Sequence, residues 1–414
     1  MNDKLVATKV SHMGREAVRL SNGETEAVIC LQGGMVSVFS IRRGEAAVNA
    51  HWIPPFRSED GKAYVQREHA AFWKSPLLYE LAGDFLCSPN FGPDCRAEGA
   101  AIPAHGWTAN MAWRIGELGL VPEAGAAFVR LFLESPDPLF PLSWERTDVL
   151  FKGQSVLFSS TLIHNRADRA LSINVARHAT VGPSFLAEGC RISVSAERFA
   201  TPPKPSEFSD TGRLAEGAEF KSLSAAPLRS GGSADLSVVP GMIGFTDLVA
   251  GPVPKEAEIG WSCVTNPRLA LAHLVLFPGR ASAGPEGIAL GFNDLWLQYG
   301  GRPFTPWAES EGGKDRCFCL GTECATGAFA NGLEYSLGHP NLLGNPTTAE
   351  IPAQSARRFE YCTALVPLDS ERAQGGALTA DLSDDGRLVL KGSGSAQKTN
   401  IDASFASLRR FIAS

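Results

Sequence analysis

Two short stretches of this chain carry side chains that can move protons. In NVARHATVGP, Arg177 and His178 follow an alternating apolar run and come just before the turn at Gly182-Pro183. In CFCLGTECATG, Glu323 likewise ends an apolar run and has small residues on both sides. A glutamate and a histidine can together remove one proton and deliver another near neutral pH. The two stretches therefore indicate acid–base chemistry, provided that the fold brings the two strand ends together.

A structural role is the alternative for several side chains in and around these stretches. His178 by itself could make a single hydrogen bond at the rim of a core, and His105 in PAHGW could cap a turn. Trp296 and Tyr299 in LWLQYGG fit a core as well as a pocket wall. Cys324 points to the opposite face of its strand from the glutamate before it, which favours a buried, inert thiol over a nucleophile.

The charge balance argues against nucleic acid or an anionic membrane surface as a partner. The chain has 414 residues, with 38 Lys and Arg against 44 Asp and Glu, a formal net charge of −6 and no basic stripe. Its longest apolar runs have the length of strands and are broken by Gly, Pro or charge, so no membrane span is predicted. The first residues, MNDKLVATKVSHMG, hold no apolar core of signal-peptide length.

The cysteines predict a reduced protein without a metal site. There are 9 of them, an odd number, and they are scattered through apolar runs such as Ile29-Cys30-Leu31 and Phe318-Cys319-Leu320. No CxxC or HxH spacing indicates metal ligands, and no nucleotide fingerprint or phosphate loop is present, so no cofactor is expected. Reduced thiols, together with the lack of a signal peptide, predict a cytoplasmic location.

The elements that must position these residues are strands. Short runs of alternating apolar residues recur along the chain, and turn residues separate them at the spacing of a sandwich or barrel. No repeat of fixed period is present, which disfavours a propeller or a solenoid. The pattern predicts one large antiparallel all-β domain over residues 1–414. Within it, residues 146–178 predict a three-strand meander, with turns at 152–154 and 165–168.

Three segments depart from this strand rhythm. Residues 51–104 form a long loop region, expected to be a functional rim or lid, with one helical candidate in HAAFWKSPLLYELAG. Residues 200–241 are rich in Pro, Ser and Gly and predict an excursion that could be an ordered lid or a mobile surface loop. The tail from Leu368 predicts a hairpin turning at residues 384–386, followed by a short terminal helix.

Four motifs, taken in order, resemble a known group of proteins. NFGPDCRAEGAAIPAHGW, NVARHATVGPSFL, LWLQYGG and LGTECATG together resemble the galactose mutarotase-like superfamily, which contains the aldose 1-epimerases. The resemblance spans roughly Asn90 to Pro367. It implies a large antiparallel β-supersandwich with loop insertions, whose concave face binds a pyranose. In such enzymes a glutamate takes the proton of the anomeric hydroxyl and a histidine protonates the ring oxygen; the ring opens and recloses as the other anomer.

The resemblance assigns roles to individual residues. Glu323 matches the general base and His178 the general acid, while His105 matches a histidine that hydrogen-bonds the sugar near its ring oxygen. Arg96 occupies the place of a substrate-binding arginine, with Asp94 or Arg177 as alternatives. The side chains expected to line the sugar pocket are Trp296, Gln298 and Tyr299. With ordinary pKa values of about 4.3 for the base and 6.5 for the acid, kcat/KM is expected to be bell-shaped and about two units wide.

The sequence leaves three functional classes open. The first is a mutarotase or related epimerase acting on a small sugar, and the second is a sugar-binding protein without turnover. The third is a glycosidase or lyase, which usually needs a second carboxylate; Asp94 and Asp294 are the candidates for it. Ala179 to Gly182 stand where well-characterised mutarotases carry an aromatic pair, so the identity of the sugar is open, as is the oligomeric state.

Overall fold

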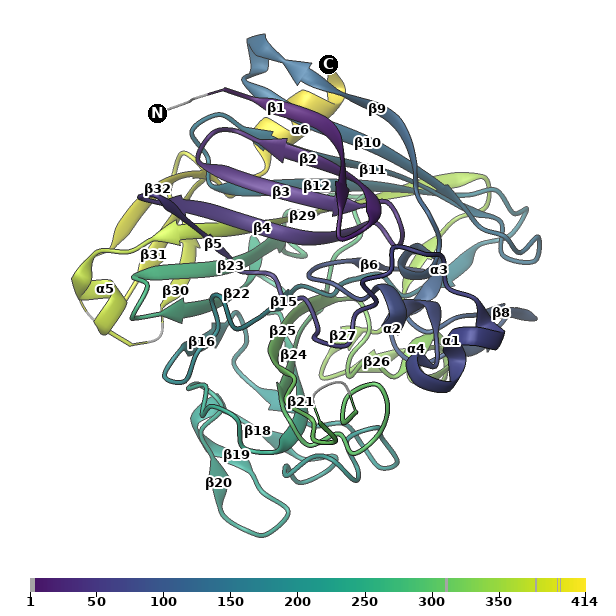
Figure 1. Ribbon diagram of the computed structural model, residues 1–414, viewed down its shortest axis with the longest axis vertical. Helices are drawn as coiled ribbons and strands as arrows, with labels where there is room; N and C mark the ends of the chain where they lie inside the picture. Colours follow the sequence, from purple (N-terminus) through teal and green to yellow (C-terminus); the bar gives the residue numbers. More distant parts are fainter. Residues whose placement is uncertain (1–3, 310–311, 377, 393, 395) are drawn as a thin grey trace.

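The computed structural model describes residues 4–309, 312–376, 378–392, 394 and 396–414. Strands predominate and helices are few and short, as the alternating pattern predicts. Most of the strands lie in three antiparallel sheets, and several short two- and three-stranded sheets decorate them (Figure 1). In the part of the chain that the structure describes, no helix is long and apolar enough to cross a membrane.

The first sheet is built by the N-terminus and follows the order of the sequence. Its strands are β1 (Val6–His12), β2 (Arg15–Ser21), β3 (Thr25–Cys30), β4 (Met35–Arg43) and β5 (Ala46–Asn49). The turn between β1 and β2 has positive φ angles at Met13 (50°) and Gly14 (76°), the geometry of a tight hairpin. The sheet lies against β9 and β10 of the second sheet (Figure 1).

The second sheet has eight strands. Its strands, from one edge to the other, are β16 (Arg191–Val194), β22 (Ile259–Asn266), β23 (Leu271–Pro278), β29 (Ser355–Pro367), β12 (Val156–Asn165), β11 (Leu142–Phe151), β10 (Ala126–Glu134) and β9 (Arg114–Val121). The hairpin of β11 and β12 turns where the sequence predicts, at residues 152–154.

The predicted third strand of that meander is wrong. The next neighbour of β12 is β29, and β13 (Leu171–Ile173) pairs with β28 (Ala349–Ile351) in a separate ribbon. The side-chain amide of Asn165 donates to the carbonyls of Arg169, Ile351 and Pro352, at 2.8, 3.0 and 3.1 Å. These bonds stabilise the bend that takes the chain out of the second sheet and toward the third.

The third sheet carries the residues that the sequence singled out for chemistry. Its order is β18 (Glu219–Phe220), β17 (Phe199–Ala200), β21 (Phe245–Pro252), β24 (Phe292–Tyr299), β25 (Phe318–Ala325), β14 (Ala176–Arg177) and β6 (Leu86–Cys87), with β15 (Thr180–Val181) also paired to β25. In the β24–β25 pair, Asp294 lies opposite Glu323 and Trp296 lies opposite Gly321. Residues directly opposite one another share a face, so these four belong to one side of the sheet.

The C-terminal tail forms an additional layer on the second sheet. It contains α5 (Ser370–Gln374), β30 (Thr379–Leu382), β31 (Arg387–Lys391), β32 (Gln397–Asp402) and α6 (Ala406–Ala413). The predicted hairpin and terminal helix are therefore confirmed. The ring of Phe411 lies 5.2 Å from that of Phe128 and 5.9 Å from that of Phe151, so the tail buries the face of the sheet that lies away from the main core.

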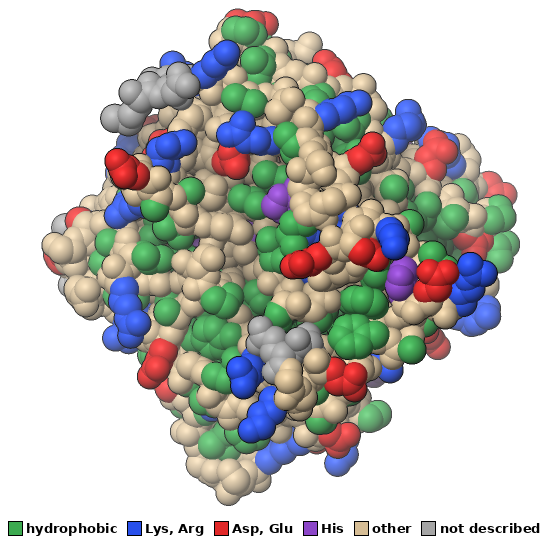
Figure 2. Space-filling view, in the orientation of Figure 1, with side chains coloured by type: hydrophobic (Ala, Val, Ile, Leu, Met, Phe, Trp, Pro, Cys, Tyr) green, Lys and Arg blue, Asp and Glu red, His purple; other side chains and the backbone are tan. Residues whose placement is uncertain are grey.

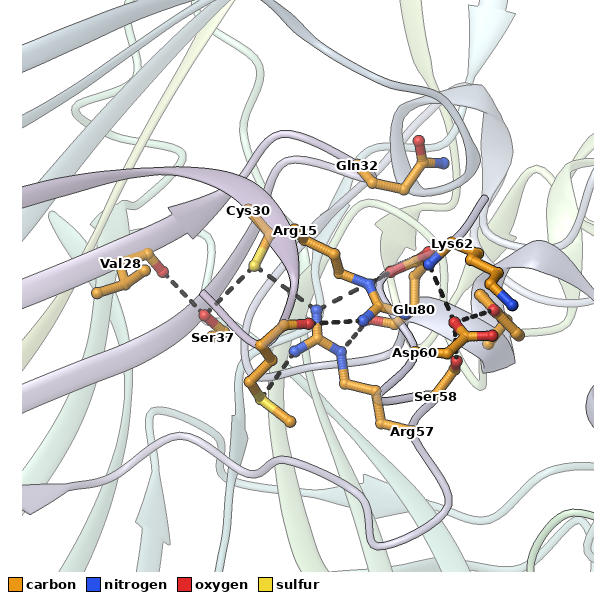
Figure 3. A network of polar contacts seen from close by, with 12 residues as sticks. Arg15, Val28, Cys30, Gln32, Ser37, Arg57, Ser58, Asp60, Lys62 and Glu80 are labelled. Atoms are coloured by element: carbon orange, nitrogen blue, oxygen red, sulfur yellow. Dashed lines mark hydrogen bonds and ion pairs between the residues drawn. The ribbon is translucent and has the colours of Figure 1, made fainter. Parts of the chain in front are cut away.

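The loop region 51–104 contains the predicted helical segment. It forms α1 (Gln66–Trp73) and α2 (Pro76–Glu80), and the Ser75 hydroxyl caps α2 by accepting from the Leu78 amide at 3.3 Å. Buried Glu80 at the end of α2 pairs with Arg15 of the first sheet, and Arg57 donates to the Glu80 carbonyl at 3.0 Å (Figure 3). This network fixes α2 against the N-terminal sheet.

The excursion at 200–241 is a folded segment held by side-chain bonds. Arg213 donates from its backbone and its Nε to the buried carboxylate of Asp247, both at 2.8 Å. Arg229 donates to the carbonyls of Leu214 and Phe208, both at 2.8 Å. Of the two alternatives for this segment, the structure favours the ordered one.

The short elements of the excursion and the rest of the chain are η2 (Leu223–Ala225), β19 (Ala226–Pro227), β20 (Ser233–Ala234), β7 (Cys95–Ala97), β8 (Ala100–Ile102), α3 (Gly106–Asn110), η1 (Pro122–Ala124), α4 (Gly332–Gly338), β26 (Asn341–Leu342) and β27 (Asn345–Pro346).

Candidate active site

A cavity of about 380 Å³ lies over the third sheet, on the face that carries Glu323 and Trp296. This volume falls within the range of about 300–1,000 Å³ that is usual for small-molecule pockets. The walls come from the loop region 51–104, the excursion, the segment after β24 and the sheet itself. Its charged and imidazole side chains are Lys74, His105, His178, Glu207, Arg302 and Glu323, and its aromatic ones are Phe85, Phe208, Trp296, Phe304 and Trp307.

Glu323 and His178 meet in this cavity. Their Oε1 and Nε2 atoms are 3.2 Å apart, and the two residues are 2% and 8% exposed. Glu323 Oε1 has no hydrogen-bond partner, although it is buried. The carboxylate folds back over Gly321, where a Cβ atom would lie 2.5 Å from Oε1. The small residue two places before the glutamate is therefore required by the position of its carboxylate.

The imidazole of His178 is held on three sides. It follows β14 and precedes β15, both of which pair with β25, so the main chain arches over the strand of Glu323. Its backbone N–H donates to the Phe85 carbonyl at 2.9 Å, and its ring stacks on the Phe85 ring at 4.7 Å and 14°. Its Nδ1 lies 3.0 Å from the Thr180 hydroxyl. These contacts direct Nε2 toward Glu323.

Burial sets the charge of this pair. Desolvation raises the pKa of Glu323 well above its ordinary value, and the nearby carboxylates of Asp294 and Glu207 raise it further. Desolvation, together with His105 beside it, lowers the pKa of His178 to about 3. The sequence assumes an ionised glutamate and a protonated histidine; the structure reverses that order. At a pH between these two pKa values, and before a ligand binds, the pair holds one proton, and that proton is on Glu323.

His105 lies in the cavity wall next to His178. The two rings are 5.3 Å apart at 76°, and His105 has a left-handed backbone (φ 56°) at the start of α3. Its Nδ1 is 3.4 Å from the thiol sulfur of Cys87, which is fully buried. Burial lowers the pKa of His105 to about 4, so it is a neutral hydrogen-bonding group at ordinary pH.

One of the three side chains expected from LWLQYGG lines the cavity. Trp296 does so, and its ring lies 5.5 Å from that of His178. Gln298 is buried behind the wall, where its Oε1 accepts from the Thr246 hydroxyl at 2.8 Å. Tyr299 lies on the opposite face of the strand, in the core, 5.5 Å from the ring of Phe318. The alternation of a strand accounts for the difference between Trp296 and Tyr299.

The three polar side chains proposed for the rim lie outside the cavity lining. Arg96 and Asp94 are exposed, and the Arg96 backbone is 3.5 Å from Glu334. Arg177 is fully buried and forms two hydrogen bonds to Asp84, at 3.1 and 2.7 Å, with its guanidinium over the Tyr361 ring. The reason is again alternation, because Arg177 directly precedes His178 and points to the other side of the sheet.

Arg302, which was not predicted from the sequence, supplies the arginine of the cavity. Its Nε donates to Gln298 Oε1 at 3.0 Å, its Nη2 donates to Glu207 Oε1 at 3.1 Å, and its Cζ lies 4.5 Å from the Trp307 ring centroid. The signal was present, since Arg302 follows LWLQYGG directly. Glu207 and Phe208 were also missed, because a Pro/Ser-rich excursion gives no sequence sign of where it folds back.

Asp294 is a second buried acid beside Glu323. Its Oδ2 accepts from the Phe329 N–H at 2.9 Å, and its Oδ1 has no partner. Phe329 and Ala330 both have positive φ angles, 67° and 48°, and Ala330 lines the cavity. Desolvation raises the pKa of Asp294 well above its ordinary value. The Asp294 carboxyl group therefore holds a strained loop at the cavity wall rather than facing the ligand space.

No group of three or more His, Cys, Asp or Glu side chains is arranged to hold a metal ion within the described residues. The cysteines there form no disulfide, as their scatter predicts. Cys324 is buried in the core on the face of β25 opposite Glu323, and burial raises the pKa of its thiol.

Comparison with known proteins finds similarity at the level of structure. A scan against models of protein families finds no match, and a search of curated proteins finds none either. Among solved structures, a candidate aldose 1-epimerase from Klebsiella pneumoniae subsp. pneumoniae matches with a TM-score of 0.62 over 86% of this chain and 81% of its own, at 13% identity. A galactose mutarotase-like protein from Clostridium acetobutylicum matches with a TM-score of 0.56 over 89% of this chain and 100% of its own, at 13% identity. A candidate aldose 1-epimerase from Escherichia coli K12 gives 0.52 over 88% and 100%, at 12% identity. At these identities the likeness is one of fold, and the chain has the galactose mutarotase-like fold.

Proposed function

We propose that the cavity opens and recloses the ring of a small sugar, so that the protein is an aldose 1-epimerase. The observation that carries this proposal is the 3.2 Å approach of His178 Nε2 to Glu323 Oε1 inside a cavity with aromatic walls. Interconverting anomers needs one proton removed from the anomeric hydroxyl and one delivered to the ring oxygen, which a single acid–base pair can do. The fold shared with candidate aldose 1-epimerases supports the same activity.

The buried proton of the pair gives the reaction its starting state. Glu323 holds the proton before a sugar binds, and His178 is neutral. A sugar hydroxyl that donates to the carboxylate stabilises its ionised form, and a ring oxygen that accepts from the imidazole stabilises its protonated form. Binding therefore favours transfer of the resident proton from Glu323 to His178. Glu323 then takes the anomeric proton while His178 protonates the ring oxygen; closure on the other face reverses both transfers.

The remaining wall residues would hold the sugar. The face of Trp296 suits the C–H side of a pyranose, and neutral His105 can exchange a hydrogen bond with a hydroxyl or the ring oxygen. The aromatic walls exclude water, which strengthens the polar contacts of the pair and limits competing proton exchange with solvent. The rigid setting of His178 on Phe85 and Thr180 supplies the orientation that proton transfer in both directions requires.

A second candidate is a sugar-binding protein without turnover. The specific observation in its favour is the low pKa of His178, about 3, because an imidazole that is hard to protonate is a weak general acid. This candidate shares the cavity, the aromatic walls and the sugar with the first. It differs in one measurable respect, which is that anomer exchange would proceed at the uncatalysed rate in the presence of a bound sugar.

The test is proton NMR of anomer exchange across a panel of aldoses, with and without protein. We expect catalysed exchange of at least one sugar, and we expect Glu323→Gln and His178→Asn each to lower turnover about a hundredfold or more while the sugar still binds. Matched controls are Glu134→Gln and His339→Asn, which change exposed residues outside the cavity lining. Full exchange activity in Glu323→Gln would show that the base lies elsewhere, and binding without exchange would establish the second candidate.

A further inference from the structure

Arg302 brings a largely buried positive charge into the cavity. Its side chain is 11% exposed and lies over the Trp307 ring at 4.5 Å and near the Trp296 ring at 5.5 Å. A guanidinium stays charged at any ordinary pH, so at this depth it needs an anionic partner. Gln298 supplies only a neutral oxygen to its Nε, at 3.0 Å.

Among the described residues, the guanidinium of Arg302 forms an ion pair with Glu207, from the excursion, whereas the carboxylate of Asp315 accepts from the Arg302 backbone N–H at 2.8 Å. Glu207 Oε1 lies 3.1 Å from Arg302 Nη2, but the Glu207 side chain is 63% exposed. An ion pair whose acid is largely in water gains little from the contact and can be exchanged at small cost. Arg302 is thus a largely buried cation with an exchangeable, solvent-facing counter-ion.

We propose that the cavity takes a sugar that carries an anionic substituent, a carboxylate or a phosphate, which displaces Glu207 from Arg302. This inference rests on the sugar-binding role proposed above and adds the chemical class of the substrate. A carboxylate or phosphate can accept two parallel hydrogen bonds from a guanidinium, which makes arginine the residue of choice for these groups. The exposed cation Lys74 also lines the cavity and adds a second positive charge near its opening.

The spacing allows one monosaccharide to reach both ends of the site. The Arg302 Cζ atom and the His178 ring centroid each lie 5.5 Å from the ring of Trp296, so they are at most about 11 Å apart. A sugar lying across Trp296 can then place its anomeric carbon at His178 and Glu323 and its acidic group at Arg302. The two ends have separate tasks, because the Glu323–His178 pair performs the chemistry and the cation fixes the orientation.

Glu207 occupies the anion position beside Arg302 until a ligand binds there. While the site holds no anion, its carboxylate neutralises Arg302 and adds to the raised pKa of Glu323. When an acidic sugar arrives, Glu207 is released into the water that it already faces. Replacing Glu207 by glutamine removes the carboxylate that competes with the ligand for Arg302. The substitution should therefore raise the affinity for acidic ligands and not that for neutral ones.

The experiment is titration calorimetry with matched sets of sugars. For each of glucose, galactose and mannose, the neutral hexose, its uronate and its 6-phosphate are compared, with inorganic phosphate and acetate as sugar-free anions. We expect at least one acidic form to bind tenfold or more tightly than its neutral parent, and its affinity to fall between about 0.02 and 0.5 M salt. Arg302→Gln should abolish the preference and Arg302→Lys should retain part of it. Glu207→Gln should tighten acidic ligands several-fold while neutral ones change less than twofold.

The control for Glu207→Gln is Glu134→Gln, which changes an equally exposed glutamate paired with Arg166 at 3.3 Å and should leave every affinity unchanged. Neutral sugars that bind and exchange as well as the acidic ones would overturn this inference and leave the proposed function standing. Acidic sugars that bind through Arg302 without anomer exchange would support this inference and overturn the proposed epimerase function. Sugar-free phosphate or acetate binding as tightly as the acidic sugars would also overturn it, since the site would then hold an anion only.

Discussion

At the scale of single residues, the position of the Glu323 carboxylate depends on the absence of a side chain at Gly321. A Cβ atom there would lie 2.5 Å from Oε1, closer than any stable contact. We expect Gly321→Ala to displace the carboxylate and lower anomer exchange about tenfold or more, since small misplacements of a catalytic group are costly. The backbone of Gly321 has no positive φ, so the protein should still fold.

The matched control for this substitution is Gly338→Ala. A Cβ at Gly338 meets no atom within 4 Å, and its backbone also has no positive φ. The comparison uses proton NMR exchange rates and urea midpoints for both variants. Exchange activity unchanged in Gly321→Ala would show that the carboxylate has room to move and that its present position is not needed for turnover.

The pH profile is a second property of single residues. With the pKa of His178 lowered to about 3 and that of Glu323 raised, the pair holds one proton between those two pKa values. We expect kcat/KM to be bell-shaped, with its acid limb set by protonation of the imidazole and its alkaline limb by loss of the carboxyl proton. The acid limb then lies near pH 3, below the value of about 4.3 expected from the sequence. Exchange followed by polarimetry from about pH 4 to 9 checks this, and an acid limb near pH 4.3 to 6.5 would contradict it.

Residue types at strand ends could be read from the sequence, and residue orientations could be read only in part. Glu323 and His178 are predicted from their positions at the ends of apolar runs, and His105 and Trp296 from the resemblance of their motifs to a known superfamily; all four side chains line the cavity. Arg177, an alternative for the substrate-binding arginine, instead pairs with Asp84, because alternation directs it to the face opposite that of His178. Arg302 and Glu207 could not be paired in advance, since 95 residues separate them in the chain.

At the scale of elements, the wall formed by α2 depends on its anchor. Glu80 is 4% exposed and pairs with Arg15, and Arg57 Nη2 is within 4.0 Å of the same carboxylate (Figure 3). We expect Glu80→Ala to lower the free energy of unfolding by about 3–5 kcal/mol, because it leaves buried arginines without their anion. Urea denaturation measures the change, and loss of ligand affinity should accompany it, since Leu77 of α2 lines the cavity.

The control for the anchor is Glu68→Ala on the neighbouring helix. Glu68 pairs with Arg67, but both side chains are more than half exposed, so about 0–1 kcal/mol is expected. If Glu80→Ala lowers the free energy of unfolding by as little as Glu68→Ala does, the two arginines become hydrated when the carboxylate is removed. The network would then not be what holds α2.

Elements with local causes were predictable, and elements with distant partners were not. The β11–β12 hairpin, the β30–β31 hairpin and the helical segment of α1 and α2 all have their turn or cap in the sequence itself. The third strand of the meander failed because β29, nearly 200 residues away, competes for the edge of β12. The ordered conformation of the excursion at 200–241 likewise depends on a distant partner, because Arg213 binds Asp247, a residue beyond the end of the excursion.

At the scale of the whole molecule, the surface agrees with the charge balance of the sequence. On the face in Figure 2, basic and acidic side chains are interspersed, and no area of a single sign dominates. The charges that could not be foreseen are internal. The core between the sheets holds Asp84 and Arg177, both fully buried, with Tyr361 donating to Asp84 at 2.5 Å. Composition alone gives no sign of such a network, because the same residues on the surface would give the same counts.

The buried titratable groups couple the stability of the whole molecule to pH. Burial lowers the pKa of five histidines: His12, His51, His105 (to about 4), His178 (to about 3) and His273 (to about 3). Each of these binds a proton on unfolding below pH 6.5, so stability falls as pH drops from there. Burial raises the pKa of Glu323 and Asp294, and each releases a proton on unfolding above its ordinary pKa, so stability falls as pH rises until the raised pKa is reached.

The sum of these two sets predicts a stability maximum near pH 6.5. Each proton changes the free energy of unfolding by about 1.4 kcal/mol per pH unit. Between about pH 4.5 and 6.5 the five histidines outweigh the two acids, and stability rises with pH. Above pH 6.5 the histidines of the unfolded chain are already neutral, so the two acids lower the stability as long as the pH is below their raised pKa values. Urea midpoints from pH 5 to 8.5 test the curve. The double variant Glu323→Gln with Asp294→Asn should lose the decline above pH 6.5 and keep the rise below it, because its histidines still titrate. A decline that persists in that variant would assign the alkaline loss to other groups.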